Sequence, residues 1–331
     1  MESQNIIGST GELQQVVSDI VSATPVTDIH THLFDTRFGD LLLWGIDELI
    51  TYHYLIAEVM RVKHGSTSPD EFYAMSKREQ ADLIWNRLYL DNSPISEACR
   101  GPITVLGALG LDVAGRDLDE MRAYFEDMTA QEYIDEVFEA AGVKEVVMTN
   151  DPFNEIEQEV WNSDQAGDER FKAALRLDGL IVDWAENWSV LKDEGYDVSE
   201  DFSGNTADEV MRFLEEWHEK MDPVYMAVSL PWDFKFPADT MMATVIEEAI
   251  LPYATRSGLP FSPMIGVKRQ LRPSLRDAGD GVGKCDITAI EHMCANYPDV
   301  KFLVTLLSRE NQHELCVAAR KFGNLMPFGC W

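Results

Sequence analysis

The stretch Pro25-Val26-Thr27-Asp28-Ile29-His30-Thr31-His32 decides the fold. Its apolar and β-branched residues predict a short β-strand, and side chains two positions apart on a strand point to the same side. His30 and His32 are therefore expected to face one point where this strand ends. Two neutral imidazoles that converge in this way can hold a divalent metal ion. The alternative is a pair of hydrogen-bonded histidines at a strand end.

Short apolar runs alternate with helical patterns along most of the remaining chain. After the histidine strand, further strands are predicted at residues 145–149, 171–177, 224–230, 261–267, 301–307 and 325–331. Most of these runs are almost continuously apolar, as parallel strands covered on both faces must be. Amphipathic helical stretches fill most of the gaps. The pattern predicts an α/β fold of the TIM (β/α)8 type with seven recognisable strands, one fewer than a closed barrel has.

A long helical insertion is expected between the first two strands, over residues 33–142. It contains three helical patterns, at residues 46–61, 70–90 and 118–141. Because a βα loop is usually a few residues long, an insertion of this size is typical of a segment that covers the strand ends or forms an oligomer contact. We expect residues 1–331 to form a single barrel-like domain, with βα units 2 to 7 over residues 143–331.

The composition argues against several classes of protein. With 331 residues, 45% of them hydrophobic, the chain can bury a sizeable core. Asp and Glu number 58 against 27 Lys and Arg, which gives a formal net charge of −31. This charge disfavours nucleic acid and anionic membranes as partners, and an anionic ligand must meet a local cation. No apolar run approaches the ~18 residues of a membrane span, and the N-terminal residues lack the pattern of a signal peptide.

Cysteine usage indicates a reducing compartment. The cysteines form no C-x-x-C pair, and their odd number argues against a disulfide framework. They are Cys99, Cys285, Cys294, Cys316 and Cys330. We expect reduced thiols and a cytoplasmic location.

Five segments, in order along nearly the whole chain, carry a resemblance to a known family. They are PVTDIHTHL at 25–33, TYHY at 51–54, ALRLD at 174–178, MIGVKR at 264–269 and LSRENQHE at 307–314. This ordered set resembles the uronate (glucuronate) isomerase family of the amidohydrolase superfamily. The resemblance implies a metal-assisted TIM barrel that interconverts D-glucuronate with D-fructuronate, and D-galacturonate with D-tagaturonate. The implied partner is therefore a small sugar acid.

The resemblance also implies roles for individual residues. His30 and His32 match the metal-binding histidines of the family, with zinc as the expected divalent ion. His53 and Tyr54 match a catalytic pair that faces the substrate, although His53 alone, on a mostly apolar helix, is more typical of a packed histidine. Arg176 matches the arginine that binds the sugar carboxylate, and a guanidinium suits this role because it binds carboxylates bidentately and stays charged.

Two departures from the family pattern concern the metal and the proton transfer. Many superfamily members place a histidine on the fifth strand, but residues 263–265 read Pro-Met-Ile, and a thioether is a poor ligand for an ion that binds sugar oxygens. The family's aspartate ligand, in an Asp-x-Arg element on the eighth strand, would lie beyond Trp331. That aspartate is the base expected to move a proton between C2 and C1 through an enediol. We therefore expect weak metal binding and no isomerase activity from this chain alone.

Trp331 falls where the family places a tryptophan against the substrate. Ser308 is predicted to cap a helix over residues 310–321, and His313, one turn into it, to pack rather than to bind metal. The turn at 150–152, Asn-Asp-Pro, follows the second strand and is ordinary turn chemistry that also lies at the functional face.

Two other functions stay open, and the first of them gives no reason for the Tyr-His-Tyr segment at 52–54 to occur together with Arg176. One is a metal hydrolase of the same superfamily, acting on an amide, ester or lactone. The other is a non-catalytic barrel fragment. Because an open barrel would leave strand edges and apolar flanks uncovered, we also expect a homo-oligomer.

Overall fold

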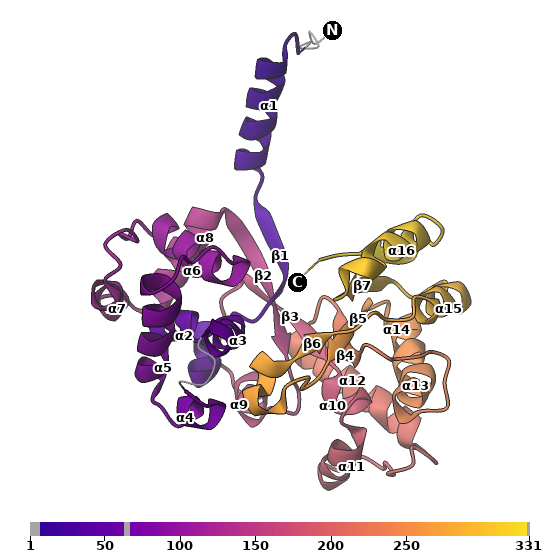
Figure 1. The fold of residues 1–331 in the computed structure, drawn as a ribbon. Coiled ribbons are helices and arrows are strands. Elements are labelled where there is room, and N and C mark those ends of the chain that lie inside the picture. The colour runs from indigo at the N-terminus through magenta and orange to yellow at the C-terminus, as the bar shows by residue number, and fades with distance from the viewer. Residues whose placement is uncertain (1–6, 63–66, 330–331) are drawn as a thin grey trace.

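A curved parallel sheet forms the centre of the protein (Figure 1). The structure is a computed structural model that describes residues 7–62 and 67–329. The strands are β1 (Val26–Thr31), β2 (Val143–Asn150), β3 (Phe171–Arg176), β4 (Met226–Pro231), β5 (Phe261–Lys268), β6 (Gly281–Val282), β7 (Phe302–Leu306) and β8 (Leu325–Pro327). The parallel order is β1-β2-β3-β4-β5-β7-β8, and β6 pairs antiparallel with β5. Within the described residues β1 and β8 each pair with a single neighbour, so the sheet is an open half-barrel, consistent with a TIM-type fold.

The seven predicted strands are confirmed, with small shifts at their ends. The apolar runs of β4, β5 and β7 are buried along most of their length, as predicted for strands covered on both faces. β1 differs, because half of its residues are exposed, as expected where one edge of a strand has no partner. The last strand is shorter than predicted, since β8 ends at Pro327.

The Gly- and Asp-rich composition of the segment at 277–283 predicts a loop, and this prediction is wrong for Gly281 and Val282. They form β6, which pairs through Val282 with Val267 on β5. The preceding residues form η4 (Pro273–Gly279), a short 3₁₀ turn. Two residues of strand are too few to produce a hydrophobic period, so the Gly- and Asp-rich composition dominated the prediction.

Helices after β2 cover the outer face of the sheet and share one core with it. They are α9 (Glu155–Trp161), α10 (Asp178–Ile181), α11 (Trp184–Asp193), α12 (Thr206–Met221), α13 (Met241–Val245), η3 (Ile246–Ile250), α14 (Leu251–Ser257), α15 (Thr288–Asn296) and α16 (Arg309–Ala319). Trp184, Phe213 and Phe302 are among the largest fully buried side chains of this core. Ser308 takes the N-cap position of α16, as predicted, but its side chain makes no capping hydrogen bond.

The helices between β1 and β2 gather on the other side of the molecule around a second core (Figure 1). They are η1 (Thr36–Leu41), α2 (Ile46–Ile50), α3 (His53–Val62), α4 (Pro69–Tyr73), α5 (Lys77–Ile84), η2 (Trp85–Leu90), α6 (Glu97–Ala108), α7 (Leu118–Glu126) and α8 (Ala130–Ala141). The three predicted helical stretches are present, each divided into shorter helices. α6 escaped prediction because Gly101 and Pro102 lie inside it and both are typical helix breakers.

One helix lies apart from both cores. α1 (Thr10–Ala23) precedes β1 and extends away from the rest of the protein, and it has no buried residue (Figure 1). Of the helices in the described ranges, none has the length and apolar character needed to cross a membrane.

The close approach of β5 and β7 gives a test of the fold. Gly266 on β5 has φ 135°, and a Cβ added there would lie 2.7 Å from Cβ of Leu307. Gly266→Ala should therefore lower the free energy of unfolding by about 1–3 kcal/mol in urea denaturation. Gly323→Ala, where a Cβ meets nothing within 4 Å, is the control and should change it by less than about 0.5 kcal/mol. Equal effects of the two substitutions would contradict this packing.

Candidate active site

The paired histidines lie together where β1 ends. His30 is in β1 and His32 follows its last residue, and their ring centroids are 5.5 Å apart with the planes nearly perpendicular. His30 is half-buried, whereas His32, just past the end of the strand, is exposed. The structure thus brings the two imidazoles side by side, as the spacing predicted.

Each imidazole is oriented by a hydroxyl group. Nδ1 of His30 lies 3.1 Å from Oη of Tyr225, whose hydrogen goes to the carbonyl oxygen of Ile29 at 2.8 Å. Nδ1 of His32 lies 3.2 Å from Oγ1 of Thr149, which donates to a main-chain carbonyl of β1 at 3.4 Å. Because each hydroxyl has a single hydrogen, donation of that hydrogen to the carbonyl oxygen pairs with the tautomer in which Nδ1 is the donor. We infer that both Nε2 atoms carry the lone pair that a metal ion requires.

The protonation state of the pair also suits a metal ion. Burial, together with smaller repulsive effects of His32 and Arg176, lowers the pKa of His30 to about 4. Burial lowers the pKa of His32 as well, again with Arg176 contributing. Both imidazoles are therefore neutral at pH 7, which is the form that binds metal.

Within the described residues, the imidazoles of His30 and His32 are the ligands available to a metal ion at this site. No group of three or more His, Cys, Asp or Glu side chains in residues 7–62 and 67–329 is arranged to hold one. Met264 on β5 is buried in a small apolar cluster with Tyr225. The donor set therefore fits an ion that takes its remaining ligands from water, from substrate or from outside the described ranges.

His53 and Tyr54 reach this region from the insertion. His53 begins α3, and its ring lies between those of Tyr52 and Tyr54, with centroids 4.3 and 4.2 Å away. Burial lowers the pKa of His53, while Asp277 and Asp280 act in the opposite direction. His53 in turn is close enough to His32 to lower the pKa of His32. The packed interpretation of His53 is thus incomplete, because its ring is half-buried and faces the histidine pair.

Arg176 ends β3 and is held from one side by an acidic neighbour. Its Nε donates to Oδ2 of Asp178 at 3.2 Å, which leaves the two terminal nitrogens of the guanidinium able to bind a carboxylate. Arg176 is close enough to His30 and His32 to act on their pKa values. The third strand therefore places a cation beside the histidine pair. Trp331, the remaining predicted substrate contact, lies outside the described residues.

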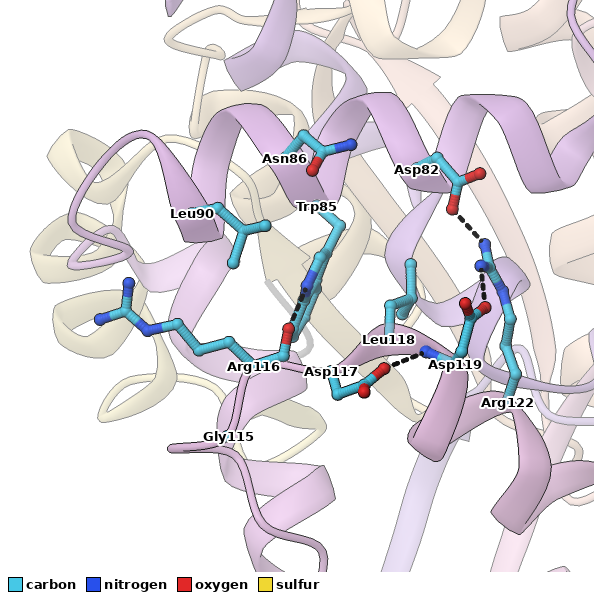
Figure 2. Close-up of a pocket in the computed structure, with 10 residues that line it drawn as sticks. All are labelled: Asp82, Trp85, Asn86, Leu90, Gly115, Arg116, Asp117, Leu118, Asp119 and Arg122. Carbon is cyan, nitrogen blue, oxygen red and sulfur yellow. Dashed lines mark hydrogen bonds and ion pairs between the residues drawn. The ribbon is translucent and has the colours of Figure 1, made fainter.

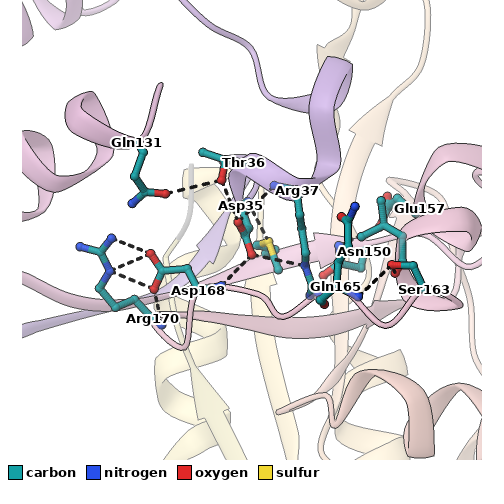
Figure 3. A network of polar contacts seen from close by, with 12 residues as sticks. Asp35, Thr36, Arg37, Gln131, Asn150, Glu157, Ser163, Gln165, Asp168 and Arg170 are labelled. Atoms are coloured by element: carbon teal, nitrogen blue, oxygen red, sulfur yellow. Dashed lines mark hydrogen bonds and ion pairs between the residues drawn. The ribbon is translucent and has the colours of Figure 1, made fainter. Parts of the chain in front are cut away.

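One buried acid near Arg176, Glu157, was not singled out by the sequence, whereas the neighbouring turn at 150–152 was. Glu157 on α9 accepts a hydrogen bond from Nδ2 of Asn150 at 2.7 Å, and both side chains are buried (Figure 3). Asp151 accepts from the main-chain N–H of Phe153, which is the predicted turn chemistry. No sequence signal marks Glu157, since it is one glutamate among several on a short helix.

Two hollows of the described surface are not lined by the histidine pair. One of about 710 Å³ is mostly apolar and is lined by α3 and α6, with Tyr54 and Arg309 at its rim. Another, of about 320 Å³, contains Arg122, whose guanidinium is paired with Asp47, Asp82 and Asp119 (Figure 2). Because that arginine is already neutralised by three carboxylates, this second hollow is a structural feature of the insertion.

Comparison with known proteins identifies the family. No protein-family model matches the chain, and no curated protein sequence does. A crystal structure of a uronate isomerase from Bacillus halodurans C-125 matches with 52% identity and a TM-score of 0.95, over 98% of this chain and 77% of that one.

Two further structures share the fold at 15% identity. A glucuronate isomerase from Caulobacter crescentus has a TM-score of 0.68, over 100% of this chain and 79% of that one. A uronate isomerase from Thermotoga maritima has a TM-score of 0.60, over 93% and 76% respectively. These two structures show the fold alone. The uronate isomerase from Bacillus halodurans, at 52% identity over 98% of this chain, also shows the family. The chain belongs to the uronate isomerase family.

Proposed function

We propose that this protein interconverts a sugar acid aldose and its ketose, D-glucuronate with D-fructuronate, and also D-galacturonate with D-tagaturonate. The observation that carries the proposal is the 52% identity, over 98% of the chain, to a uronate isomerase. The arrangement of the site supports it. A carboxylate-binding arginine and a histidine pair lie together at the carboxyl ends of parallel strands, which is where TIM-type enzymes build their active sites.

The reaction moves one proton from C2 to C1 of the open-chain sugar through an enediol. Arg176 would bind the carboxylate through its two terminal nitrogens, because its Nε is already engaged by Asp178. This contact orients the sugar with its reactive end toward the histidines. His53 and Tyr54 would donate hydrogen bonds to the oxygens that gain negative charge in the enediolate.

We also propose a zinc site at His30 and His32 and membership of the amidohydrolase superfamily. Support comes from two neutral imidazoles at the end of the first strand, each held by a hydroxyl at Nδ1 so that Nε2 is available. When bound, a divalent ion there would polarise and orient substrate oxygens.

A cytoplasmic location is proposed as well, since the cysteines of the described ranges, Cys99, Cys285, Cys294 and Cys316, are all free.

Turnover tests the function and the role of Arg176 together, in a version of the chain that also carries the Asp-x-Arg element of the family, since no isomerase activity is expected from this chain alone. D-glucuronate should be converted to D-fructuronate, and Arg176→Met should lower kcat/KM roughly 100-fold or more, because loss of a charged hydrogen-bond partner costs about 2–5 kcal/mol. Arg320→Met, which removes an exposed cation at the end of α16, is the control and should leave kcat/KM unchanged. Hydrolysis of an amide, ester or lactone with no isomerisation would contradict the function. Activity of Arg176→Met within about twofold of wild type would place the carboxylate elsewhere.

Zinc binding to the purified chain tests the histidine pair. We expect weak binding of one zinc ion per chain in equilibrium dialysis, and at least a tenfold further loss of affinity in His30→Ala, because one of two imidazole ligands is removed. His313→Ala is the matched control, since His313 is exposed on α16, and it should retain wild-type affinity. Equal zinc binding by wild type and His30→Ala would rule out this site.

We propose in addition that the protein is a homo-oligomer in which α1 packs against a second copy. An isolated helix of 14 residues is only marginally stable in water. α1 nevertheless exposes Leu13, Val17 and Ile20, which lie on one face at helical spacing. It contains no Lys or Arg, and this composition disfavours an anionic membrane as the partner that covers the helix.

Light scattering after size exclusion tests this association. Val17→Asp places a charge in the middle of the apolar face and should shift the wild-type oligomer to a smaller species at micromolar concentration. Ser18→Asp adds the same charge outside that face and should leave the mass unchanged. A wild-type protein that is already monomeric would contradict the proposal.

A further inference from the structure

Arg176 is surrounded by acidic side chains. Asp178 pairs with its Nε at 3.2 Å, and Asp151 and Glu157 are near enough to favour its charged form. These acids come from the start of α10, the end of β2 and α9. All three are largely withdrawn from water, and Glu157 is only 3% exposed. One guanidinium thus faces three carboxyl groups in a poorly solvated region.

The excess of acidic groups around Arg176 opposes the binding of a sugar acid. The inference that follows rests on the proposed function. If all three acids were ionised, the group would carry a net charge of −2 before the sugar carboxylate arrived and −3 afterwards. Charges a few ångströms apart in a partly buried site repel strongly. The protein as a whole carries a formal net charge of −31, so its electrostatic field does not offset this repulsion. One of the acids must therefore be neutral when the sugar acid is bound.

Glu157 is the acid whose surroundings best accommodate a proton. Asp178 is paired directly with the guanidinium of Arg176, at 3.2 Å. Glu157 has no ion pair within the described ranges, and its hydrogen-bond partner is an uncharged amide, Nδ2 of Asn150 at 2.7 Å. Burial raises the pKa of Glu157 to about 7, against the opposing effects of the hydrogen bonds from Asn150 and from the main chain of Asp151.

The side-chain amide of Asn150 has an oxygen, Oδ1, that can accept a hydrogen bond from protonated Glu157. Its side chain is fully buried, and its Oδ1 has no hydrogen-bond partner in the part of the chain that the structure describes. Rotation of the amide by half a turn exchanges Oδ1 and Nδ2, so the same amide can donate to a carboxylate or accept from a carboxylic acid. Asn150 can therefore keep a hydrogen bond to Glu157 in both of its protonation states.

The other charged groups around α9 are already engaged. η1 packs against α9, and its Arg37 pairs with Asp35 at 3.3 Å and lies over the ring of Trp161 (Figure 3). The end of β2 presents Asp151, and β3 presents Arg176. Of the two cations Arg37 and Arg176, Arg176 is the one that acts on the pKa of Glu157. Arg176 is also the cation that a sugar carboxylate would bind.

We propose that Glu157 is a positioning residue that takes up a proton when a sugar acid binds to Arg176. The ionised protein, the sugar carboxylate and one proton from solvent form a complex in which Glu157 is neutral, and no bond of the sugar changes. Release of the sugar returns the proton. In this arrangement the charge of Glu157 balances part of the charge of Arg176 while the site is empty, and Glu157 loses its own charge when the carboxylate arrives.

Calorimetry on the wild-type chain tests the proposal without any substitution. D-glucuronate is titrated at pH 8 in two buffers of different ionisation enthalpy, HEPES and Tris. We expect uptake of most of one proton per bound sugar, and a Kd that rises between pH 7 and 9 by up to tenfold per pH unit. Binding with no proton uptake would overturn the inference and leave the isomerase function standing. Absence of binding would overturn both.

Glu157→Gln keeps the shape and the hydrogen bond but cannot titrate. Its proton uptake should vanish, and its Kd should stay near the low-pH value of wild type from pH 7 to 9. Glu159→Gln, which removes an exposed carboxylate from the same helix, should behave as wild type. Proton uptake that persists in Glu157→Gln would assign the linkage to another group and overturn the proposal.

Thermal unfolding shows whether the variant is folded and whether Glu157 titrates in the free protein. A folded pKa of about 7, raised above the ordinary value near 4.5, means that the stability contributed by this group is lost as the pH rises toward 7. The Tm of Glu157→Gln should therefore exceed that of wild type by a margin that grows from pH 5 to 7 and then levels off. A lower Tm for Glu157→Gln at pH 8 would contradict a buried, titrating Glu157.

Discussion

Parallel pairing of the strands is the constraint on which the site depends. Parallel neighbours end at the same edge of a sheet, so residues far apart in sequence meet there without any loop having to carry them. The register aligns Thr31 with Met148, Asn150 with Leu175, and Arg176 with Ala227. The histidines after β1, the amide that ends β2 and the arginine that ends β3 therefore form one group.

Burial sets the protonation states of these side chains. It lowers the pKa of a base and raises the pKa of an acid. Low solvation penalises the charged form of any side chain, so it keeps His30 and His32 neutral and raises the pKa of Glu157. Arg176 stays charged because a guanidinium does not lose its proton in a protein and because Asp178 pairs with it. Neutral imidazoles, a titratable acid and a permanent cation thus arise from one environment.

The helical insertion was predicted in outline, but its contribution to the site depends on a break that the sequence does not mark. Residues 46–61 were predicted as one helix, whereas α2 ends at Ile50 and α3 begins at His53. The hydroxyl of Thr51 bonds back to the carbonyl oxygen of Asp47 and closes the last turn of α2. Neither Gly nor Pro signals this break. It places His53 in the first turn of a new helix, beside the two tyrosines and near His32.

The sequence by itself determined the strand order, the side-by-side histidines and, through resemblance to a family, Arg176. Each of these follows from local period or from a short motif, which chain neighbours specify. The tertiary structure alone decided which acids face Arg176, that Thr149 and Tyr225 orient the imidazoles, and that Asn150 and Glu157 form a buried pair. Such contacts join side chains on different elements, and no pattern in one segment records how closely another segment packs against it.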